Sequence, residues 1–224
     1  MKNEFLPPKQ QRSRDTHARL LAATLHTLEA HGLEGATIPR IAEFAGVAPA
    51  TLYRRFRDRD ALYRAALMHS LEASAVATRK TIRLESFNDR TLDGVAGSLV
   101  ATTIAQYRSH PGLTRALTRF IESDSDREFR ARALALLGEN FDQLVQVLLE
   151  FRSEVMHPDP RRAITFALLN MATVVEVRTL EQVSMWNDLL PLSDADLHSE
   201  ITRSLLAYLR YPRAADDGNL TGNT

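Results

Sequence analysis

Hydrophobic residues recur at three- and four-residue intervals along most of the chain, and no long stretch alternates between hydrophobic and polar residues. This spacing places apolar side chains on one face of an α-helix. The first predicted helix covers residues 14–31, and its apolar stripe consists of Ala18, Leu21, Leu25 and Leu28. The pattern therefore predicts an all-α protein, and a hydrophobic content of 44% is enough for a sizeable core.

Turn residues divide the rest of the chain into further helices. Asp58 is expected to cap a long helix that ends near residue 80, and Ser193 to cap the last helix. Pro212 ends that helix, so residues 212–224 are expected to form a polar, disordered tail. The other predicted helices cover residues 38–45, 49–57, 91–109, 113–121, 126–151, 160–185 and 194–210.

Residues 38–57 contain two short helical segments that are separated by Gly46. Glycine adopts a positive φ at little cost, so the chain can turn sharply there. The first segment follows Thr37, a good N-cap, and the second begins at Pro49, a residue favoured in the first turn of a helix. Two short helices joined in this way and packed on a longer one form a helix-turn-helix motif. The second helix of that motif lies in the major groove of DNA.

The two sides of this second helix differ in chemistry. At about 100° per residue, one side collects Ala48, Pro49, Leu52 and Phe56. The opposite side carries small, hydroxyl and cationic residues, namely Ala50, Thr51, Arg54 and Arg57. The first side is expected to pack inward and the second to face DNA.

Charge is distributed unevenly, although the net charge of the whole chain is zero. Residues 1–64 carry 11 basic and 7 acidic side chains, and residues 65–224 carry 17 and 21. The N-terminal part therefore has a net charge of +4, which favours binding to a polyanion. Residues 1–13 are expected to form a flexible basic arm, which either lies near the DNA backbone or is a disordered tail.

The candidate DNA-binding residues combine close approach, hydrogen bonding and positive charge. Small residues let the helix approach DNA, hydroxyl groups donate to phosphates or bases, and arginine neutralises phosphate or contacts guanine. We expect base contacts from Thr51 and Arg54, and phosphate contacts from Tyr53 and Arg59. The full set is Thr37, Arg40, Ala48, Pro49, Ala50, Thr51, Tyr53, Arg54, Arg55 and Arg59.

Fixed spacing over several helices makes residues 14–67 resemble the DNA-binding domain of the tetracycline-repressor (TetR) family. The matching positions are Thr37, Ile41-Ala42, Ala45-Gly46-Val47, Leu52-Tyr53, Phe56 and Asp58-Arg59-Asp60-Ala61-Leu62. Three positions depart from the family pattern. Ala48 stands where serine is usual, Arg55 where histidine or tyrosine is usual, and Arg59 where lysine is usual.

The resemblance implies a DNA-binding domain at residues 14–64 and a larger helical domain at residues 65–211 that dimerises and binds a small effector. The implied partners are a palindromic double-stranded operator, an unidentified effector and a second copy of the chain. Aromatic and apolar residues are expected to line the effector pocket, namely Phe87, Tyr107, Phe120, Phe141, Met171 and Trp186. The two helices near the C-terminus are expected to supply the dimer interface through Phe166, Ala167, Asn170, Val174, Leu197, Ile201 and Leu205.

Several classes of chemistry lack support in the sequence. The chain has no cysteine, its seven histidines show no metal-ligand spacing, and it has no glycine-rich phosphate loop. We therefore expect neither a metal nor a cofactor. The first residues lack the apolar segment of a signal peptide, and the longest nearly uncharged run, residues 163–175, is too short to span a bilayer. We expect a cytoplasmic protein without a membrane-spanning segment.

The leading interpretation is a homodimeric repressor that a small-molecule effector releases from its operator. An activator, or a regulator without an effector, would keep the DNA binding and change its consequence. An enzyme with a helical catalytic domain is a distant alternative, because no nucleophile–base pair or metal set is present. An architectural DNA-binding protein would require a strong net positive charge, and the net charge is zero.

Overall fold

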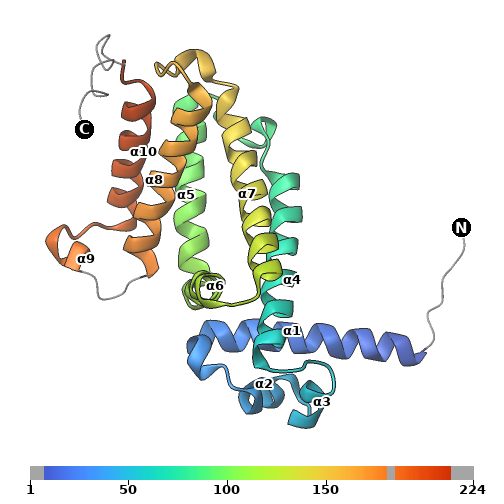
Figure 1. The fold of residues 1–224 in the computed structure, drawn as a ribbon. Helices are drawn as coiled ribbons and strands as arrows, with labels where there is room; N and C mark the ends of the chain where they lie inside the picture. The colour runs from blue at the N-terminus through green and yellow to red at the C-terminus, as the bar shows by residue number, and fades with distance from the viewer. Residues whose placement is uncertain (1–7, 181–184, 213–224) are drawn as a thin grey trace, which may run out of the picture. The chain divides into compact units, whose positions relative to one another are not determined.

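The computed structural model describes residues 8–180 and 185–212, and every regular element among these residues is a helix (Figure 1). This confirms the all-α prediction. The α-helices are α1 (Pro8–Gly35), α2 (Ile38–Ala45), α3 (Pro49–Tyr53), α4 (Arg59–Thr81), α5 (Leu92–Ser109), α6 (Pro111–Ser123), α7 (Arg127–Leu149), α8 (Pro160–Leu180), α9 (Met185–Leu189) and α10 (Asp194–Leu209). Two short 3-10 helices, η1 (Leu84–Ser86) and η2 (Arg152–Glu154), lie in the connections.

The chain forms two compact units that alternate along the sequence. Unit 1 comprises Met1–Ala75 and His110–Leu137, and unit 2 comprises Val76–Ser109 and Gly138–Thr224. Both α4 and α7 pass from one unit into the other. The sequence analysis instead divides the chain into consecutive domains at residue 64, and that functional division stays a prediction.

Unit 1 is built around α1. Leucines 20 and 28 of this helix are fully buried, and they belong to one core with Ile41 of α2, Leu52 of α3 and Leu62 of α4. Helix α6 packs along α1, and the carboxylate of Glu29 accepts hydrogen bonds from the first backbone N–H groups of α6. Unit 1 therefore consists of the three helices α1, α2 and α3 with α4, α6 and the start of α7 added to their core.

Unit 2 has a core formed mainly by α5, α8 and α10, which pack on one another. Ser193 caps α10 as predicted, because its side chain accepts a hydrogen bond from the N–H of Asp196, whose carboxylate accepts one from the N–H of Ser193. Helix α8 is long and apolar enough to be counted as a candidate membrane span, with a mean hydropathy of 1.4. Most of its buried residues belong to the core of unit 2, as is usual for the central helix of a folded domain.

Several predicted boundaries differ from the structure. Helix α1 begins at Pro8, so residues 8–13 are helical and not part of a flexible arm. Proline is favoured at the first position of a helix, and Gln11 supports this turn by donating to the carboxylate of Asp15 at 2.9 Å. Ala18, expected in the apolar stripe, is exposed. The remaining arm residues 1–7, residues 181–184 of the predicted helix 160–185, and the tail residues 213–224 lie outside the described residues.

Candidate DNA-binding surface

The turn between α2 and α3 has the geometry that the sequence predicts. Gly46 has φ 64° and ψ 40°, the left-handed conformation that favours glycine. Its backbone N–H donates to the carbonyl groups of Ala42 and Glu43, and the N–H of Val47 donates to Ala42 at 3.0 Å. These bonds satisfy the last carbonyl groups of α2 and turn the chain directly into α3.

One side of α3 is buried and the other is exposed. Leu52 is buried, and Phe56 packs half-buried against the same core. Ala48 and Pro49, which the helical wheel places on the inner side, are exposed, because α3 is only five residues long and its first turn lies beyond the core. The exposed surface carries Ala48, Pro49, Ala50, Tyr53, Arg54 and Arg55, with Thr51 half-buried beside them.

The arginines at the end of α3 are held by short-range hydrogen bonds. The guanidinium of Arg54 donates to the hydroxyl of Thr51 at 3.3 Å, and that of Arg55 donates to the hydroxyl of Ser13 on α1 at 3.3 Å. Thr51 and Arg54 are three residues apart on a helix, so the sequence predicts that they lie close together. Ser13 and Arg55 are 42 positions apart in the sequence, so their contact could not be predicted from local spacing. Each guanidinium has five donors, so most remain free for phosphate or base acceptors.

Two predicted residues lie at the start of α2. Thr37 occupies the N-cap position, but its side chain makes no capping hydrogen bond, contrary to its expected role. Pro39 within the first turn lacks one of the N–H groups that a cap would bind. Arg40 is exposed and donates to the carbonyl of Gly35 at 3.0 Å. Its guanidinium therefore stays next to the turn between α1 and α2.

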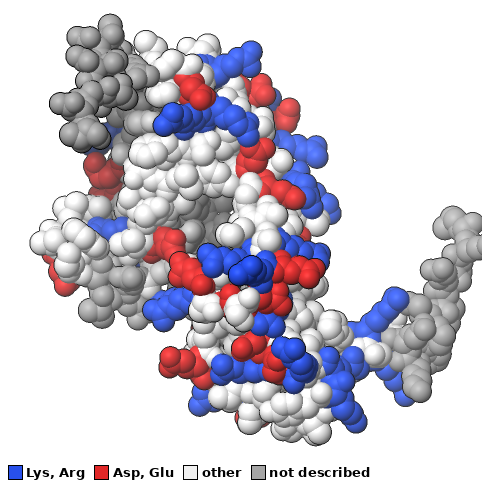
Figure 2. All heavy atoms as spheres, in the orientation of Figure 1, with Lys and Arg blue, Asp and Glu red and all other residues white. Residues whose placement is uncertain are grey.

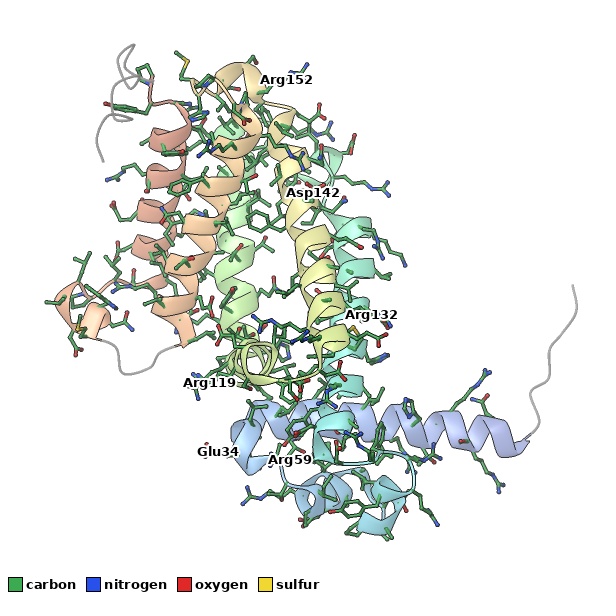
Figure 3. All side chains as sticks on the ribbon, viewed as in Figure 1. Glu34, Arg59, Arg119, Arg132, Asp142 and Arg152 are labelled. Atoms are coloured by element: carbon green, nitrogen blue, oxygen red, sulfur yellow. The ribbon has the colours of Figure 1, made fainter. Side chains whose placement is uncertain are left out.

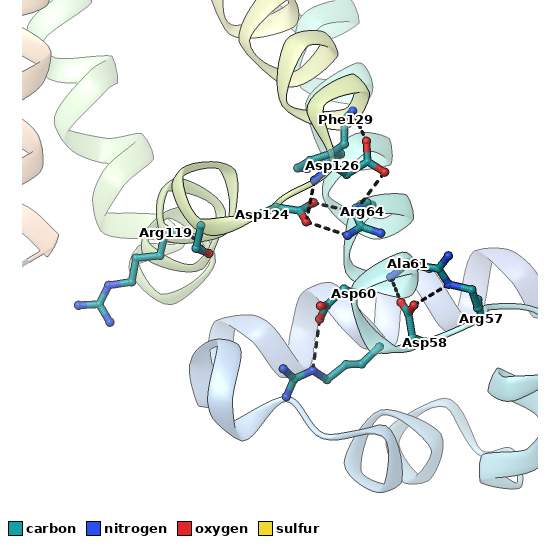
Figure 4. A network of polar contacts seen from close by, with 11 residues as sticks. Arg57, Asp58, Asp60, Ala61, Arg64, Arg119, Asp124, Asp126 and Phe129 are labelled. Atoms are coloured by element: carbon teal, nitrogen blue, oxygen red, sulfur yellow. Dashed lines mark hydrogen bonds and ion pairs between the residues drawn. The ribbon is translucent and has the colours of Figure 1, made fainter.

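The start of α4 contributes a further cation. Asp58 caps this helix as predicted, because its carboxylate accepts a hydrogen bond from the N–H of Ala61 at 2.7 Å (Figure 4). That bond, together with one from Arg57, lowers the pKa of Asp58. Arg59 lies 3.6 Å from the carboxylate of Asp60, and its side chain is about half exposed (Figure 3). Such an exposed pair is weak, so DNA phosphate can compete for Arg59.

Tyr63 is a supporting residue that the sequence analysis missed. Its ring is buried, and its hydroxyl lies 3.0 Å from the carbonyl of Leu33 and 2.5 Å from that of Ala36. The guanidinium of Arg59 lies 5.4 Å from the centre of the same ring, within the range of a cation–π contact. Tyr63 therefore fixes the turn before α2 and also positions Arg59. An aromatic residue among the apolar positions of a helix is typical of a core residue, so its position alone does not reveal these contacts.

The surface around α2 and α3 carries more basic than acidic side chains, since Glu34, Glu43 and Asp60 are the exposed acidic residues between residues 34 and 60. In Figure 2 the end of unit 1 that holds these helices shows white and blue side chains with some red among them. Arg40, Arg54, Arg55 and Arg57 are all exposed there. Among the described residues, no group of three or more histidine, aspartate or glutamate side chains could hold a metal ion.

The predicted effector residues do not form one group. Phe120 lies in unit 1, where its ring contacts those of Tyr63 and Phe129 edge-on. Trp186 is 54% exposed on α9. The other four, Phe87, Tyr107, Phe141 and Met171, belong to the core of unit 2 or pack against it.

A cavity of about 580 Å³ lies elsewhere in unit 2. The cavity has none of the six predicted effector residues in its lining, which consists of Arg108, Arg178, Thr179, Asn187, Pro191, Leu192, Ser193 and Leu197. Its size is in the range of small-molecule sites. Arg178 crosses from α8 to donate to the carbonyl groups of Trp186 and Leu190. The polar lining arises from sequence-distant residues, so helical spacing could not reveal it.

The predicted dimer residues fall into two groups. Ala167, Leu197, Ile201 and Leu205 are buried in the core of their own unit, so they are not available to a partner. A four-residue repeat marks the buried face of a helix, and it does not distinguish its own core from an interface. Phe166, Asn170 and Val174 are exposed on α8.

Comparison with known proteins agrees with this geometry. Residues 20–66 match the model of the bacterial regulatory proteins of the tetR family. The HTH-type transcriptional regulator BetI of Paraburkholderia phytofirmans is 34% identical over 73 residues, which are 33% of this chain and 37% of that relative. The match thus spans little more than a third of the length of BetI.

Solved structures extend the likeness of the fold over most of the chain. FadR of Bacillus subtilis, solved in complex with stearoyl-CoA, has a TM-score of 0.60 and 15% identity over 86% of this chain and 97% of its own. A TetR family transcription regulator from Marinobacter aquaeolei has a TM-score of 0.57 and 18% identity over 89% of this chain and 98% of its own. The sequence match and the turn geometry at Gly46 identify residues 20–66 as a DNA-binding domain of the tetR family of bacterial regulatory proteins, and the solved structures show a similar fold over most of the chain.

Proposed function

We propose that this protein is a DNA-binding transcriptional regulator whose α3 enters the major groove of an operator. The observation that supports this most directly is the exposed surface of α3 beside the turn at Gly46. Arg54 and Thr51 would contact base edges, and Tyr53 and Arg59 would contact phosphates. Small side chains at Ala48, Pro49 and Ala50 permit the close approach that base contacts require.

We further propose that the protein acts as a homodimer through an exposed apolar face of unit 2. Phe166, Leu169 and Val174 are exposed on α8, and the ring of Phe166 lies 5.3 Å from that of Tyr208 on α10. Apolar area of this kind gains free energy when a partner covers it. Two copies related by twofold symmetry would contact a palindromic operator in successive major grooves, roughly 34–36 Å apart.

The proposed regulation is release from the operator when a small molecule binds unit 2. The cavity of about 580 Å³ supports a ligand-binding role for this unit. An effector that favours a conformation with low DNA affinity must, by reciprocity, bind more weakly to the DNA-bound protein. A regulator that activates transcription, or one without an effector, would use the same DNA-binding surface.

Selection from a random duplex pool, followed by salt titration of selected and scrambled duplexes, tests the DNA-binding role. Arg59→Ala should weaken binding to both duplexes and reduce the salt slope of log K by roughly one. Arg54→Ala should cost about 1–3 kcal/mol on the selected duplex and relax the preference at one base pair. Circular dichroism controls for folding. Folded variants that bind both duplexes like the parent protein would contradict the placement of α3 on DNA.

A further inference from the structure

The first turns of α1 project beyond the core of unit 1. We call residues 11–19 the α1 extension. Each of these residues is exposed except Thr16, which is half-buried, and the first fully buried residue of α1 is Leu20. At 1.5 Å per residue this segment is roughly 14 Å long. Figure 1 shows α1 running past α3 towards the N-terminus.

The chemistry of the α1 extension fits a polyanion better than a protein surface. It carries Arg12, Arg14 and Arg19 against one acidic residue, Asp15, which accepts a hydrogen bond from Gln11. It has no large apolar side chain. The buried centre of a protein–protein interface is depleted of charged residues and enriched in aromatic ones, so this segment has the wrong composition for that role.

Two contacts connect the α1 extension with the end of α3. Arg55 donates to the hydroxyl of Ser13 at 3.3 Å, and the ring of His17 stacks on that of Phe56 with 5.7 Å between centres and 21° between planes. The extension therefore continues the cationic surface that includes Arg54, Arg55 and Arg57. A helix with little packing of its own is held beside the helix that contacts DNA.

We infer that the α1 extension is a second DNA-contacting element, which binds backbone phosphates of the DNA that flanks the base pairs contacted by α3. The inference rests on the proposed function, because it requires α3 to face DNA. It adds a sequence-independent contact outside the helix-turn-helix motif. Arginine side chains on both flanks of a projecting helix suit this role, since phosphates follow the groove on either side.

The test compares the double variant Arg12→Ala/Arg14→Ala with the control Arg130→Ala/Arg152→Ala. Both remove two exposed arginines, and the control residues lie on α7 and η2. Alanine favours helix, so the extension should keep its structure. On a selected duplex with about one helical turn, roughly 10 bp, of flanking DNA at each end, the first variant should reduce the salt slope of log K by about 1.8. The control should match the parent protein.

Two further comparisons test whether the effect depends on positive charge and on flanking DNA. Arg12→Lys/Arg14→Lys keeps both charges and should restore the parental slope. A duplex trimmed of its flanks should bind the parent protein and the alanine variant with equal slopes. Three results would each overturn the inference. The parent protein and the alanine variant could have equal salt slopes on the flanked duplex, or the control could lose as much slope as the alanine variant. The alanine variant could also keep its reduced slope on the trimmed duplex. A parent protein that binds no duplex would instead refute the proposed function before any variant is compared.

Discussion

The guanidinium of Arg64 on α4 binds the carboxylate of Asp124 through two parallel hydrogen bonds. Nε lies 2.6 Å from Oδ2 and Nη2 lies 2.7 Å from Oδ1 (Figure 4). The Asp124 side chain is only 3% exposed and that of Arg64 is 19% exposed. The second carboxylate, Asp126, lies 3.7 Å from Arg64. This buried pair joins α4 to the turn between α6 and α7 within unit 1.

Asp124→Asn should lower the free energy of unfolding by about 3 kcal/mol at pH 7, because it leaves the charge of Arg64 buried with poorer compensation. Urea denaturation measures the loss. The double variant Arg64→Met/Asp124→Asn removes both charges and should recover part of it. Equal stability of the parent protein and Asp124→Asn would show that Asp126 or solvent compensates Arg64 fully.

Acid should weaken this contact. The hydrogen bonds from Arg64 lower the pKa of Asp124 below its usual value of 3.8. At pH values between the pKa of Asp124 in the folded protein and its higher pKa in the unfolded chain, the unfolded chain binds more protons than the folded protein. The free energy of unfolding therefore falls as the pH drops below about 4. The free energy of unfolding should therefore fall less steeply with acidification in Asp124→Asn than in the parent protein. Asp58 and Asp93 also have lowered pKa values, so some acid sensitivity should remain in the variant.

Gly112 should tolerate no side chain. A Cβ atom at this position would lie 2.0 Å from the backbone oxygen of Glu29, where α6 packs on α1. Gly112→Ala must separate the two helices, and we expect a loss of about 3 kcal/mol, the upper end for an overpacked core. The matched control is Gly138→Ala in α7, because a Cβ atom there would have no neighbour within 4 Å. Alanine at position 138 should stabilise the protein by about 0.5–1 kcal/mol.

Ala48 occupies the N-cap position of α3, with φ −71° and ψ 144°, and it has no capping side chain. Ala48→Ser should let a hydroxyl group accept a hydrogen bond from an early N–H of α3. We expect a gain of about 0.5–2 kcal/mol, observed as a higher melting transition of the free protein. A lower transition would show that the serine hydroxyl does not reach those N–H groups.

Val174→Glu should separate the proposed dimer without unfolding the monomer. Val174 is 38% exposed on α8, so glutamate is solvated in the single chain but buried without a partner in the dimer. Sedimentation at micromolar concentration gives the subunit number. Leu134→Glu, which changes another exposed apolar residue on α7, should leave it unchanged. Ala167→Glu is unsuitable, because Ala167 is buried in its own unit and the charge would disrupt the fold. A dimeric Val174→Glu would remove this part of α8 from the interface.

Local signals in the sequence predict the DNA-binding motif well. Gly46, Pro49 and Asp58 each carry a backbone preference that nearby residues decide, and the structure confirms a positive φ, a helix start and a cap at these positions. The burial of Leu52 follows from the same short-range pattern. Thr37 occupies the predicted N-cap position of α2, but its side chain makes no capping hydrogen bond.

Tertiary neighbours could not be predicted in the same way. Helical spacing shows that Phe120 and Leu205 lie on apolar faces, but not which helix covers each face. Phe120 contacts Tyr63 in unit 1, and Leu205 is covered by its own core. The contact between Ser13 and Arg55 joins residues 42 positions apart, so no local pattern contains it.

The packing of α6 on α1 has a consequence for the order in which the chain folds during synthesis. Residues 76–109 must emerge before Gly112 reaches Glu29, so Ala116, Phe120 and Ile121 of α6 join the core of unit 1 late. A nascent chain that ends before residue 110 would expose apolar surface on α1 that α6 later covers, and such surface promotes aggregation. The stage of translation between residues 75 and 137 is therefore where this protein should depend most on chaperones.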